Sequence, residues 1–415
     1  MKAEVLAIGS ELLTPLRFDT NAVYITARLL EAGVEVAART TVGDDAGLLA
    51  SVFRAALARA DIVIATGGLG PTEDDLTREA AAAAVERGLK RDPAVLEGLR
   101  ARFARYHRPM APVNEKQADV IEGARLLPNP RGTAAGQYLE ERGKLLVLLP
   151  GPPLEMEPMF REQVLPLIRA KAGSSVLKTR VLRIASMSES DVEQTVAPLY
   201  MRFTNPRTTI LSSPGQVELH LTAGGSSEAD AEERIEALAA LIRPALPDRI
   251  YSEDGRELHE VVAALLKERG LTLALAESCT GGLLAARLTE VPGASAFLER
   301  GYVTYSNRAK VELLGVDAGL VETSGAVSEE VARAMAAGAR RQAGTDLGLA
   351  ITGIAGPDGG TLAKPVGLVY IALDGSAGTQ VRRAHFVGER ERVRFQACQL
   401  ALEMLRRGLL DLPPL

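Results

Sequence analysis

Residues 271–282 read LTLALAESCTGG, and this stretch decides the fold class of the region around it. Leu271–Ala276 is an apolar run of strand length, which passes through small hydroxyl residues into Gly281-Gly282. The preceding segment, Leu258–Arg269, carries apolar residues at helical spacing. A helix, a buried strand and a second helix beginning near Gly281 predict an α/β domain with a sheet covered on both faces.

Polar or glycine-rich turns follow three of the apolar strands predicted in residues 253–415. We predict strands at 271–276, 301–305, 346–351 and 367–373, and helices from 307, over 327–343 and over 390–407. Because ligands in such folds bind beyond the carboxyl ends of the strands, these turns should converge on one edge of the sheet. Residues 253–415 are therefore predicted to form one α/β domain with a site at that edge.

Two further domains are predicted upstream of this one. Residues 1–170 alternate apolar strands, such as Glu4–Gly9 and Asp61–Thr66, with amphipathic helices, which predicts a parallel sheet. Residues 171–252 predict a small α+β domain of order β-α-β-β-α, for which we expect a spacer or dimerisation role rather than RNA binding. Other expected features are a helical insert (92–121), a hairpin (136–140, 144–149), a helix (155–170) and a linker (171–175).

Composition restricts the functions open to the chain. A net charge of −5 gives no electrostatic case for general nucleic-acid binding. With two cysteines and four scattered histidines, a bound metal would be a hard cation on oxygen ligands, such as Mg²⁺. The N-terminus runs directly into a strand, and no apolar run approaches the roughly 20 residues that span a bilayer. We therefore expect a cytoplasmic protein without membrane contact.

The turn after residues 271–276 offers a nucleophile. Ser278 lies where a strand meets a helix N-terminus, and it could attack a carbonyl if a neighbouring group removed its proton. Tyr305 and Lys310 flank the next strand–helix junction and can face the same crevice. Lysine is an adequate general base only when burial or a nearby cation lowers its pKa. The turn at 351–357 could supply backbone donors to an oxyanion.

Simpler interpretations of these residues stay open at this point. Ser278 and Thr280 could merely cap the following helix. Cys279 is a rival nucleophile, although no histidine lies in these motifs to activate it. Asn307 could bind a phosphate or ribose, or could simply begin an exposed helix.

A second candidate site follows the strand DIVIAT, in GGLGPTEDDLT at residues 67–77. The backbone amides of Gly67, Gly68 and Gly70 could approach a phosphate, beside a helix expected to start near Asp74. Acidic residues there would repel a bare phosphate but could hold a cation that bridges to it. N-capping by Asp74 or Asp75 is the alternative. The candidate metal ligands are Glu11, Asp19, Asp74, Asp75 and Glu155.

The motifs ESCTGG, YSNRAK and TGIAGP together resemble the C-terminal domain of the CinA family of competence/damage-inducible proteins, over about residues 255–410. The resemblance implies deamidation of nicotinamide mononucleotide (NMN) to nicotinate mononucleotide and ammonia, without a cofactor. It implies Ser278 as nucleophile, Lys310 as general base and Tyr305 as a partner in proton transfer. Substrate or oxyanion binding then falls to Thr280, Gly281, Asn307, Thr352 and Gly353.

GGLGPTEDDLT, with GSELL and PGPPLE, resembles the MoaB/MogA-like molybdopterin-binding domain as it occurs in CinA, over about residues 1–170. In that setting the resemblance implies hydrolysis of ADP-ribose to AMP and ribose 5-phosphate, with Mg²⁺ or a similar divalent cation and with K⁺ as a further candidate. Asp75 aligns with the acid most often implicated in function in this fold. The chain departs from the family at Pro15, where glycine is usual, and at Ala135, where proline is usual.

The leading hypothesis is a bifunctional hydrolase of pyridine-nucleotide metabolism that acts on NMN and ADP-ribose. Its partners would be these small nucleotides, and the family implies a homodimer. One alternative is a non-catalytic protein, either molybdopterin-like or a partner in DNA uptake or recombination. Another is a chain in which only the C-terminal amidase is active, which Pro15 motivates.

Overall fold

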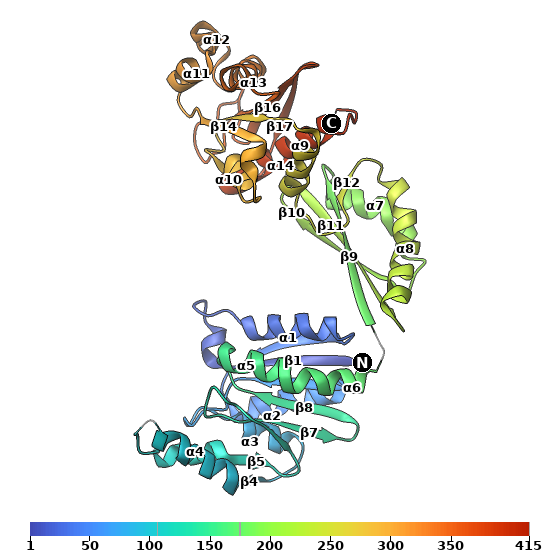
Figure 1. Ribbon diagram of the computed structural model, residues 1–415, viewed down its shortest axis with the longest axis vertical. Helices are drawn as coiled ribbons and strands as arrows, with labels where there is room; N and C mark the ends of the chain where they lie inside the picture. The colour runs from blue at the N-terminus through green and yellow to red at the C-terminus, as the bar shows by residue number, and fades with distance from the viewer. Residues whose placement is uncertain (106, 174–175, 415) are drawn as a thin grey trace. The chain divides into compact units, whose positions relative to one another are not determined.

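The computed structural model describes residues 1–105, 107–173 and 176–414 (Figure 1). By its contacts the chain divides into two compact units, Met1–Lys178 with Ala223–Arg234 and Thr179–Thr222 with Ile235–Leu415. Each predicted domain contains its own β-sheet, so the expected mixed α/β class is confirmed. Among the helices described, none is long and apolar enough to cross a membrane.

The N-terminal domain is a six-stranded sheet in the order β2-β1-β3-β8-β7-β6. Its first four strands run parallel, and the β7–β8 hairpin and β6 are antiparallel. Helices α1, α5 and α6 cover one face, and α2 and α3 cover the other (Figure 1). The strands are β1 (Lys2–Ile8), β2 (Glu35–Val42), β3 (Ile62–Thr66), β6 (Arg125–Leu127), β7 (Gly136–Glu141) and β8 (Lys144–Leu149). The helices are α1 (Thr20–Glu31), α2 (Ala46–Arg59), α3 (Thr77–Ala84), α5 (Pro153–Met159) and α6 (Leu165–Ala172).

Three expectations for this region need correction. The helix after the glycine loop, α3, begins at Thr77 rather than near Asp74, because Asp75 closes a turn instead. The expected helical insert is helical in α4 (Pro93–Arg105) and a 3₁₀ turn (Pro112–Ala118), and it ends as the strand β5 (Asp119–Ile121), which pairs with β4 (Leu89–Arg91). The predicted linker 171–175 begins inside α6, and residues 174–175 lie outside the described residues.

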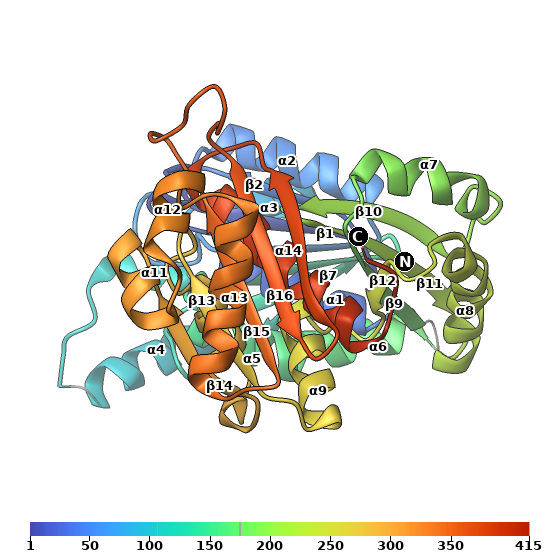
Figure 2. The same ribbon diagram turned by 90° about the horizontal axis from the view of Figure 1, so that it is seen from above.

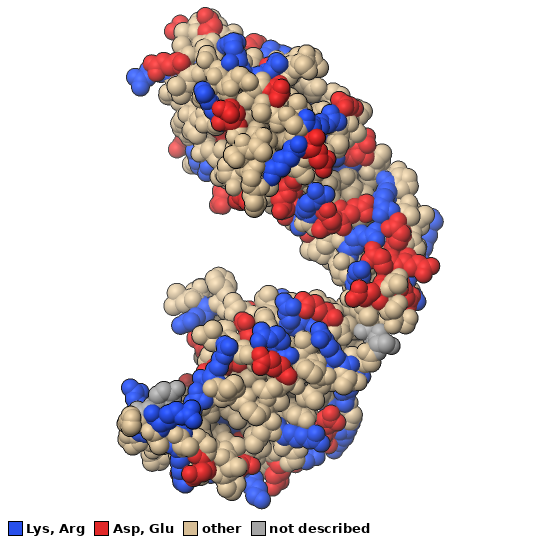
Figure 3. Space-filling view, in the orientation of Figure 1, with Lys and Arg blue, Asp and Glu red and all other residues tan. Residues whose placement is uncertain are grey.

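The middle domain is a four-stranded sheet in the order β10-β11-β9-β12 with two helices. Its elements are β9 (Val176–Ala185), α7 (Glu189–Tyr200), β10 (Arg207–Ser213), β11 (Gln216–Gly225), α8 (Glu228–Ala245) and β12 (Ile250–Ser252). The order confirms the β-α-β-β-α prediction and adds β12, and Ser188 caps α7 by accepting from the Asp191 amide. Arg180 and Arg243 pair with Glu236 and Glu253, and Figure 3 shows acidic and basic side chains interspersed around α8.

The C-terminal domain is a five-stranded sheet in the order β14-β13-β15-β16-β17, parallel over the first three strands and antiparallel after them. Its strands are β13 (Leu273–Glu277), β14 (Leu298–Val303), β15 (Leu347–Gly353), β16 (Leu368–Gly375) and β17 (Gly378–His385). Its helices are α9 (Leu258–Arg269), α10 (Leu283–Thr289), α11 (Asn307–Leu314), α12 (Ala318–Ser324), α13 (Glu329–Ala343) and α14 (Arg390–Leu409).

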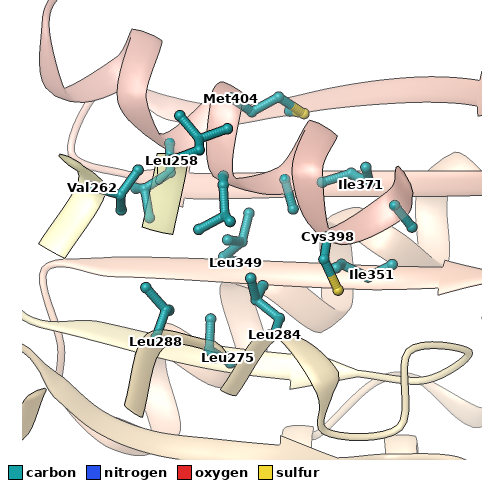
Figure 4. Close-up of a cluster of buried hydrophobic side chains, with 14 of the residues drawn as sticks. Leu258, Val262, Leu275, Leu284, Leu288, Leu349, Ile351, Ile371, Cys398 and Met404 are labelled. Atoms are coloured by element: carbon teal, nitrogen blue, oxygen red, sulfur yellow. The ribbon is translucent and has the colours of Figure 1, made fainter. Parts of the chain in front are cut away.

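Alternation of large and small residues along the C-terminal strands decides which helix covers which face. Leu275, Leu349 and Ile371 point into the core under α9, α10 and α14 (Figure 4). The alternate positions are alanines, such as Ala276 and Ala350, and they face the alanine-rich α13 (Figure 2). Small residues let α13 approach closely: a Cβ on Gly348 would lie 2.2 Å from the carbonyl oxygen of Ala336 in α13. This packing fixes the carboxyl ends of β13 and β15, where the candidate site lies.

Candidate functional site

The C-terminal site is centred on a buried contact between Ser278 and Lys310. Lys310 Nζ lies 3.1 Å from Ser278 Oγ and donates to the Thr304 carbonyl at 2.7 Å. Ser278 follows β13, and Lys310 lies in the first turns of α11, whose N-terminus is capped by Ser306. Neither side chain is more than 8% exposed, and burial lowers the pKa of Lys310 below its ordinary value. The lysine is therefore biased towards the neutral amine that can accept a proton from serine.

Glu277 holds the turn that carries Ser278. Its buried carboxylate accepts hydrogen bonds from the backbone amides of Gly282, Leu284 and Ala285 at 2.8–3.1 Å, and so it caps α10. The interpretation of Ser278 and Thr280 as helix caps is therefore wrong: the Ser278 hydroxyl accepts from Lys310, and the Thr280 hydroxyl has no recorded partner among the described residues. Sequence reasoning assigned Glu277 no role, although a charged residue that ends a buried strand was the available signal.

Glu277→Gln is expected to destabilise the C-terminal domain by about 3 kcal/mol, because a neutral amide cannot replace charge-assisted bonds to three backbone donors. Chemical denaturation followed by circular dichroism measures the change. Glu322→Gln, at an exposed position on α12, is the matched control and should stay within about 0.5 kcal/mol of the parent. Equal stability of the two variants would contradict the capping role.

Two backbone amides follow Ser278 in the turn. Within the described chain, the amides of Cys279 and Thr280 donate to no recorded acceptor, and they directly follow Ser278. The Thr280 and Thr304 hydroxyls are buried and likewise have no recorded partner among the described residues. Arg394 of α14 donates to the Thr280 carbonyl at 2.6 and 3.2 Å, which fixes the orientation of this peptide. Two successive amides directly after a serine hydroxyl are the kind of donors from which oxyanion holes are built.

The other predicted C-terminal residues have contacts or positions of their own. The Tyr305 side chain is 58% exposed, and its hydroxyl accepts from Arg390 rather than contacting Ser278 or Lys310. Arg390 also donates to the Gly356 carbonyl, so it links two of the predicted turns. The remaining residues are Thr352 (hydroxyl donating to the Ala326 carbonyl), Gly353 (the end of β15), Asn307 (the exposed start of α11) and Gly281 (exposed, φ +59°).

Cys279 is poorly suited to replace Ser278 as nucleophile. Its side chain is 5% exposed and packs into the core beneath α9, α10 and α14. Burial raises the pKa of the Cys279 thiol to about 12, so the thiol stays protonated and unreactive near neutral pH.

The N-terminal site is a cavity of about 680 Å³ at the carboxyl ends of β1, β3 and β8. All of the predicted phosphate-binding glycines and candidate metal ligands line it: Gly67, Gly68, Gly70, Glu11, Asp19, Asp74, Asp75 and Glu155. The sequence missed Asp44 and the rim residues Arg17 and Phe18. Asn21 donates to the Gly151 carbonyl and to Thr66, and it thereby ties α1 to the turn before α5.

Only part of the glycine loop is free to bind an anion. The Gly67 amide donates to the Leu149 carbonyl and the Gly70 amide to Asp75, which leaves the amides of Gly68 and Leu69 without a recorded acceptor in the described chain. Gly67 has φ +107°, and a Cβ there would lie 2.0 Å from a carbonyl oxygen of β1, so only glycine fits. The loop is thus held close against the first strand.

A buried arginine holds the loop from beneath. Arg78 is fully buried in α3 and donates to the carbonyls of Leu69 and Gly70 at 2.8 and 2.9 Å. Its Nε has no recorded partner among the described residues, and burial lowers the pKa of Arg78. The peptides that carry the Gly68 and Leu69 amides are held by Thr77 instead: its hydroxyl donates to the Gly67 carbonyl and its amide to the Gly68 carbonyl, so the two N–H groups point away from Thr77.

Arg78→Met is expected to destabilise the N-terminal domain by about 3 kcal/mol, because two buried carbonyls lose charge-assisted donors. In a domain of this size that corresponds to a fall of about 6–12 °C in Tm. Thermal unfolding followed by circular dichroism measures it, with Arg54→Met on the exposed face of α2 as control. An unchanged Tm for Arg78→Met would show that the loop does not depend on this side chain.

The acidic residues of the cavity have the chemistry of ligands for a hard cation but do not form a complete cage. Across residues 1–105, 107–173 and 176–414, no three His, Cys, Asp or Glu side chains gather closely enough to hold a metal. Asp75 accepts from the Gly70 and Thr72 amides, and Glu155 accepts from Asn129. Six carboxylates and one arginine line the cavity, so its charge is strongly negative.

Fold and site together define a three-domain α/β protein with a buried serine–lysine pair at the edge of its C-terminal sheet. Its three parts match three family models: "Probable molybdopterin binding domain" over residues 4–170, "Damage-inducible protein CinA KH domain" over 179–252 and "CinA C-terminal domain" over 255–409. The chain belongs to the CinA family.

Two full-length relatives and one solved structure that matches about a third of the chain carry the CinA name. A CinA-like protein of Solibacter usitatus is 49% identical over 409 residues, which cover 99% of this chain and 98% of the relative. A CinA-like protein of Koribacter versatilis is 47% identical over 414 residues, covering 99% and 100%. A crystal structure of a competence-damaged protein (CinA) superfamily protein from Klebsiella pneumoniae shares 39% identity over 37% of this chain and 96% of its own, with a TM-score of 0.36.

Proposed function

We propose that the C-terminal domain is a serine amidohydrolase that converts NMN to nicotinate mononucleotide and ammonia. The observation that carries the proposal is the 3.1 Å contact between Ser278 Oγ and the amine of Lys310 in a buried site. A primary amide resists attack unless a base removes the proton of the nucleophile and donors stabilise the oxyanion. Both groups are available beside Ser278.

In the first half of the reaction, Ser278 Oγ attacks the amide carbon while Lys310 Nζ accepts the hydroxyl proton. The carbonyl oxygen becomes an oxyanion, and the amides of Cys279 and Thr280, which have no recorded acceptor among the described residues, would donate to it. When the C–N bond breaks, Lys310 returns its proton to the leaving nitrogen, and ammonia departs.

In the second half, water attacks the ester on Ser278, and Lys310 takes the proton of this water as it did that of serine. The C–O bond to Ser278 breaks, Ser278 Oγ regains a proton from Lys310, and the carboxylic acid leaves. Over the cycle one amide and one water yield one acid and one ammonia, so lysine ends in its starting state. The Thr304 carbonyl, which accepts from Lys310, orients the amine throughout.

For the N-terminal domain we propose hydrolysis of ADP-ribose at its pyrophosphate, to AMP and ribose 5-phosphate, with a divalent cation. The free amides of Gly68 and Leu69 would bind one phosphate. Six cavity carboxylates would repel a second one unless a cation neutralised them. When bound, the cation would supply charge neutralisation and polarise the phosphoryl group.

Assays on the purified full-length chain test both activities. Incubation with NMN, without added metal, should release ammonia and nicotinate mononucleotide in equal amounts. Incubation with ADP-ribose should release AMP only when Mg²⁺ or a similar cation is present. If the folded protein left NMN and other small amides intact, the serine–lysine pair would belong to a binding site, and the amidohydrolase proposal would be wrong.

A further inference from the structure

An exposed aromatic ring stands at the rim of the N-terminal cavity. Phe18 lines the cavity, yet its side chain is 87% exposed. A phenyl ring left in water at a cavity rim forgoes the burial that normally stabilises aromatic residues, so its position needs a reason. Leu16, two residues earlier, is similarly exposed at 85% but is not among the described residues that line the cavity.

The backbone beneath the ring is held in place. The Thr20 amide donates to the Phe18 carbonyl at 3.1 Å, and Asp19 caps α1 by accepting from the Ala22 amide at 2.8 Å. The backbone of Phe18 is therefore held by hydrogen bonds just before α1, while its ring stays exposed to solvent. A ring presented in this way loses little conformational freedom when a flat ligand stacks on it.

The cavity has two chemically different parts, a polar floor and an apolar rim. Its floor is the glycine loop with the free amides of Gly68 and Leu69, and most of its charged lining is acidic. Its apolar rim contains Phe18 together with the exposed prolines Pro152, which caps α5, and Pro153, the first residue of that helix. The start of α5 can be followed in Figure 1. A ligand that matches both parts carries phosphates at one end and a flat, weakly charged ring system at the other.

We propose that Phe18 is the base platform of this site, on which the purine base of an adenine nucleotide stacks while its phosphate reaches the glycine loop. The inference rests on the proposed ADP-ribose activity and assigns the residue that recognises the adenine half of that substrate. Stacking of a base on an aromatic side chain accounts for roughly tenfold in affinity. Phe18 is thus a specificity residue and takes no part in the hydrolytic step.

Calorimetric titration of the full-length chain in Mg²⁺ with AMP and, separately, with ribose 5-phosphate tests the assignment. Phe18→Ala should weaken AMP binding about tenfold and leave ribose 5-phosphate within twofold, because only AMP carries a base. Phe18→Trp should keep AMP affinity within threefold. Leu16→Ala is the matched control, since it removes an equally exposed apolar side chain from the same loop.

Several outcomes would contradict the proposal that Phe18 is a base platform. They are absence of AMP binding to the parent chain, equal losses for both ligands in Phe18→Ala, and an unchanged AMP affinity in that variant. If AMP affinity is unchanged and sedimentation shows a smaller species, the ring is instead a contact between two copies of the chain. Phe18-dependent AMP binding without cleavage of ADP-ribose would retain the platform and refute the proposed hydrolysis.

Discussion

Replacing Ser278 with alanine is expected to lower ammonia release from NMN by about 10⁴-fold or more, since the proposed nucleophile is removed and the neighbouring Cys279 thiol is buried and protonated. The lysine beside it remains buried, but it has no hydroxyl to activate. Steady-state assays of ammonia and nicotinate mononucleotide at saturating NMN measure the loss. Hydrolysis of ADP-ribose by the same variant should stay within about twofold of the parent, because Ser278 lies in the C-terminal domain.

Cys279→Ala is the matched control for Ser278→Ala. Both substitutions remove one side-chain atom from adjacent positions of the same turn, yet the buried thiol is expected to contribute only to packing. Activity on NMN should therefore remain within about threefold of the parent. If Cys279→Ala lost activity while Ser278→Ala kept it, the roles of the two residues would have to be exchanged. If Ser278→Ala lost both activities without unfolding, the two-site proposal would be wrong.

Much of the C-terminal site follows from local sequence. An apolar run that stops at small polar residues and glycines marks the end of a buried strand, and the α/β order places such ends at one edge of the sheet. Ser278 and Lys310 could be proposed together because each lies in or just after such a turn. The structure adds that the two side chains are in hydrogen-bonding contact and that the lysine is buried.

The residues that sequence reasoning missed act through partners it could not place. Glu277 caps α10 only because that helix begins within reach of its carboxylate. Arg394 holds a carbonyl 114 residues away in sequence, at Thr280, and Arg390 reaches Tyr305 across 85 residues. No periodicity encodes such a pairing, because it depends on how α14 packs against the sheet.

In the N-terminal domain, too, the sequence predicted the motif but not the contacts that its residues make. The glycine loop and its acidic residues were recognisable from residues 67–77, and they do line one cavity. Which amides are free was not predictable, because Asp75 uses the Gly70 amide to close the loop. Arg78 looked like an ordinary helix residue, yet it is buried and donates to two carbonyls of the glycine loop, so it supports that loop.

Lys310→Met is expected to lower NMN hydrolysis by about 10³-fold, because the general base is removed while the side-chain volume is nearly kept. Lys310→Arg should be about as inactive, since arginine does not shed its proton near neutral pH. In the parent chain, activity should rise with pH as Lys310 loses its proton, with a midpoint below the ordinary lysine pKa of 10.5. A pH profile of kcat/KM measures this midpoint.

Unfolding free energies supply an independent test of the same pKa. Burial lowers the pKa of Lys310 in the folded chain, so between that value and 10.5 the unfolded chain binds more protons than the folded one. The parent should therefore gain stability relative to Lys310→Met as pH rises through this window, and lose it as pH falls. If the difference in unfolding free energy between the two proteins stayed constant with pH, Lys310 would be titrating as an ordinary lysine. The activation of Ser278 by this residue would then lack its physical basis.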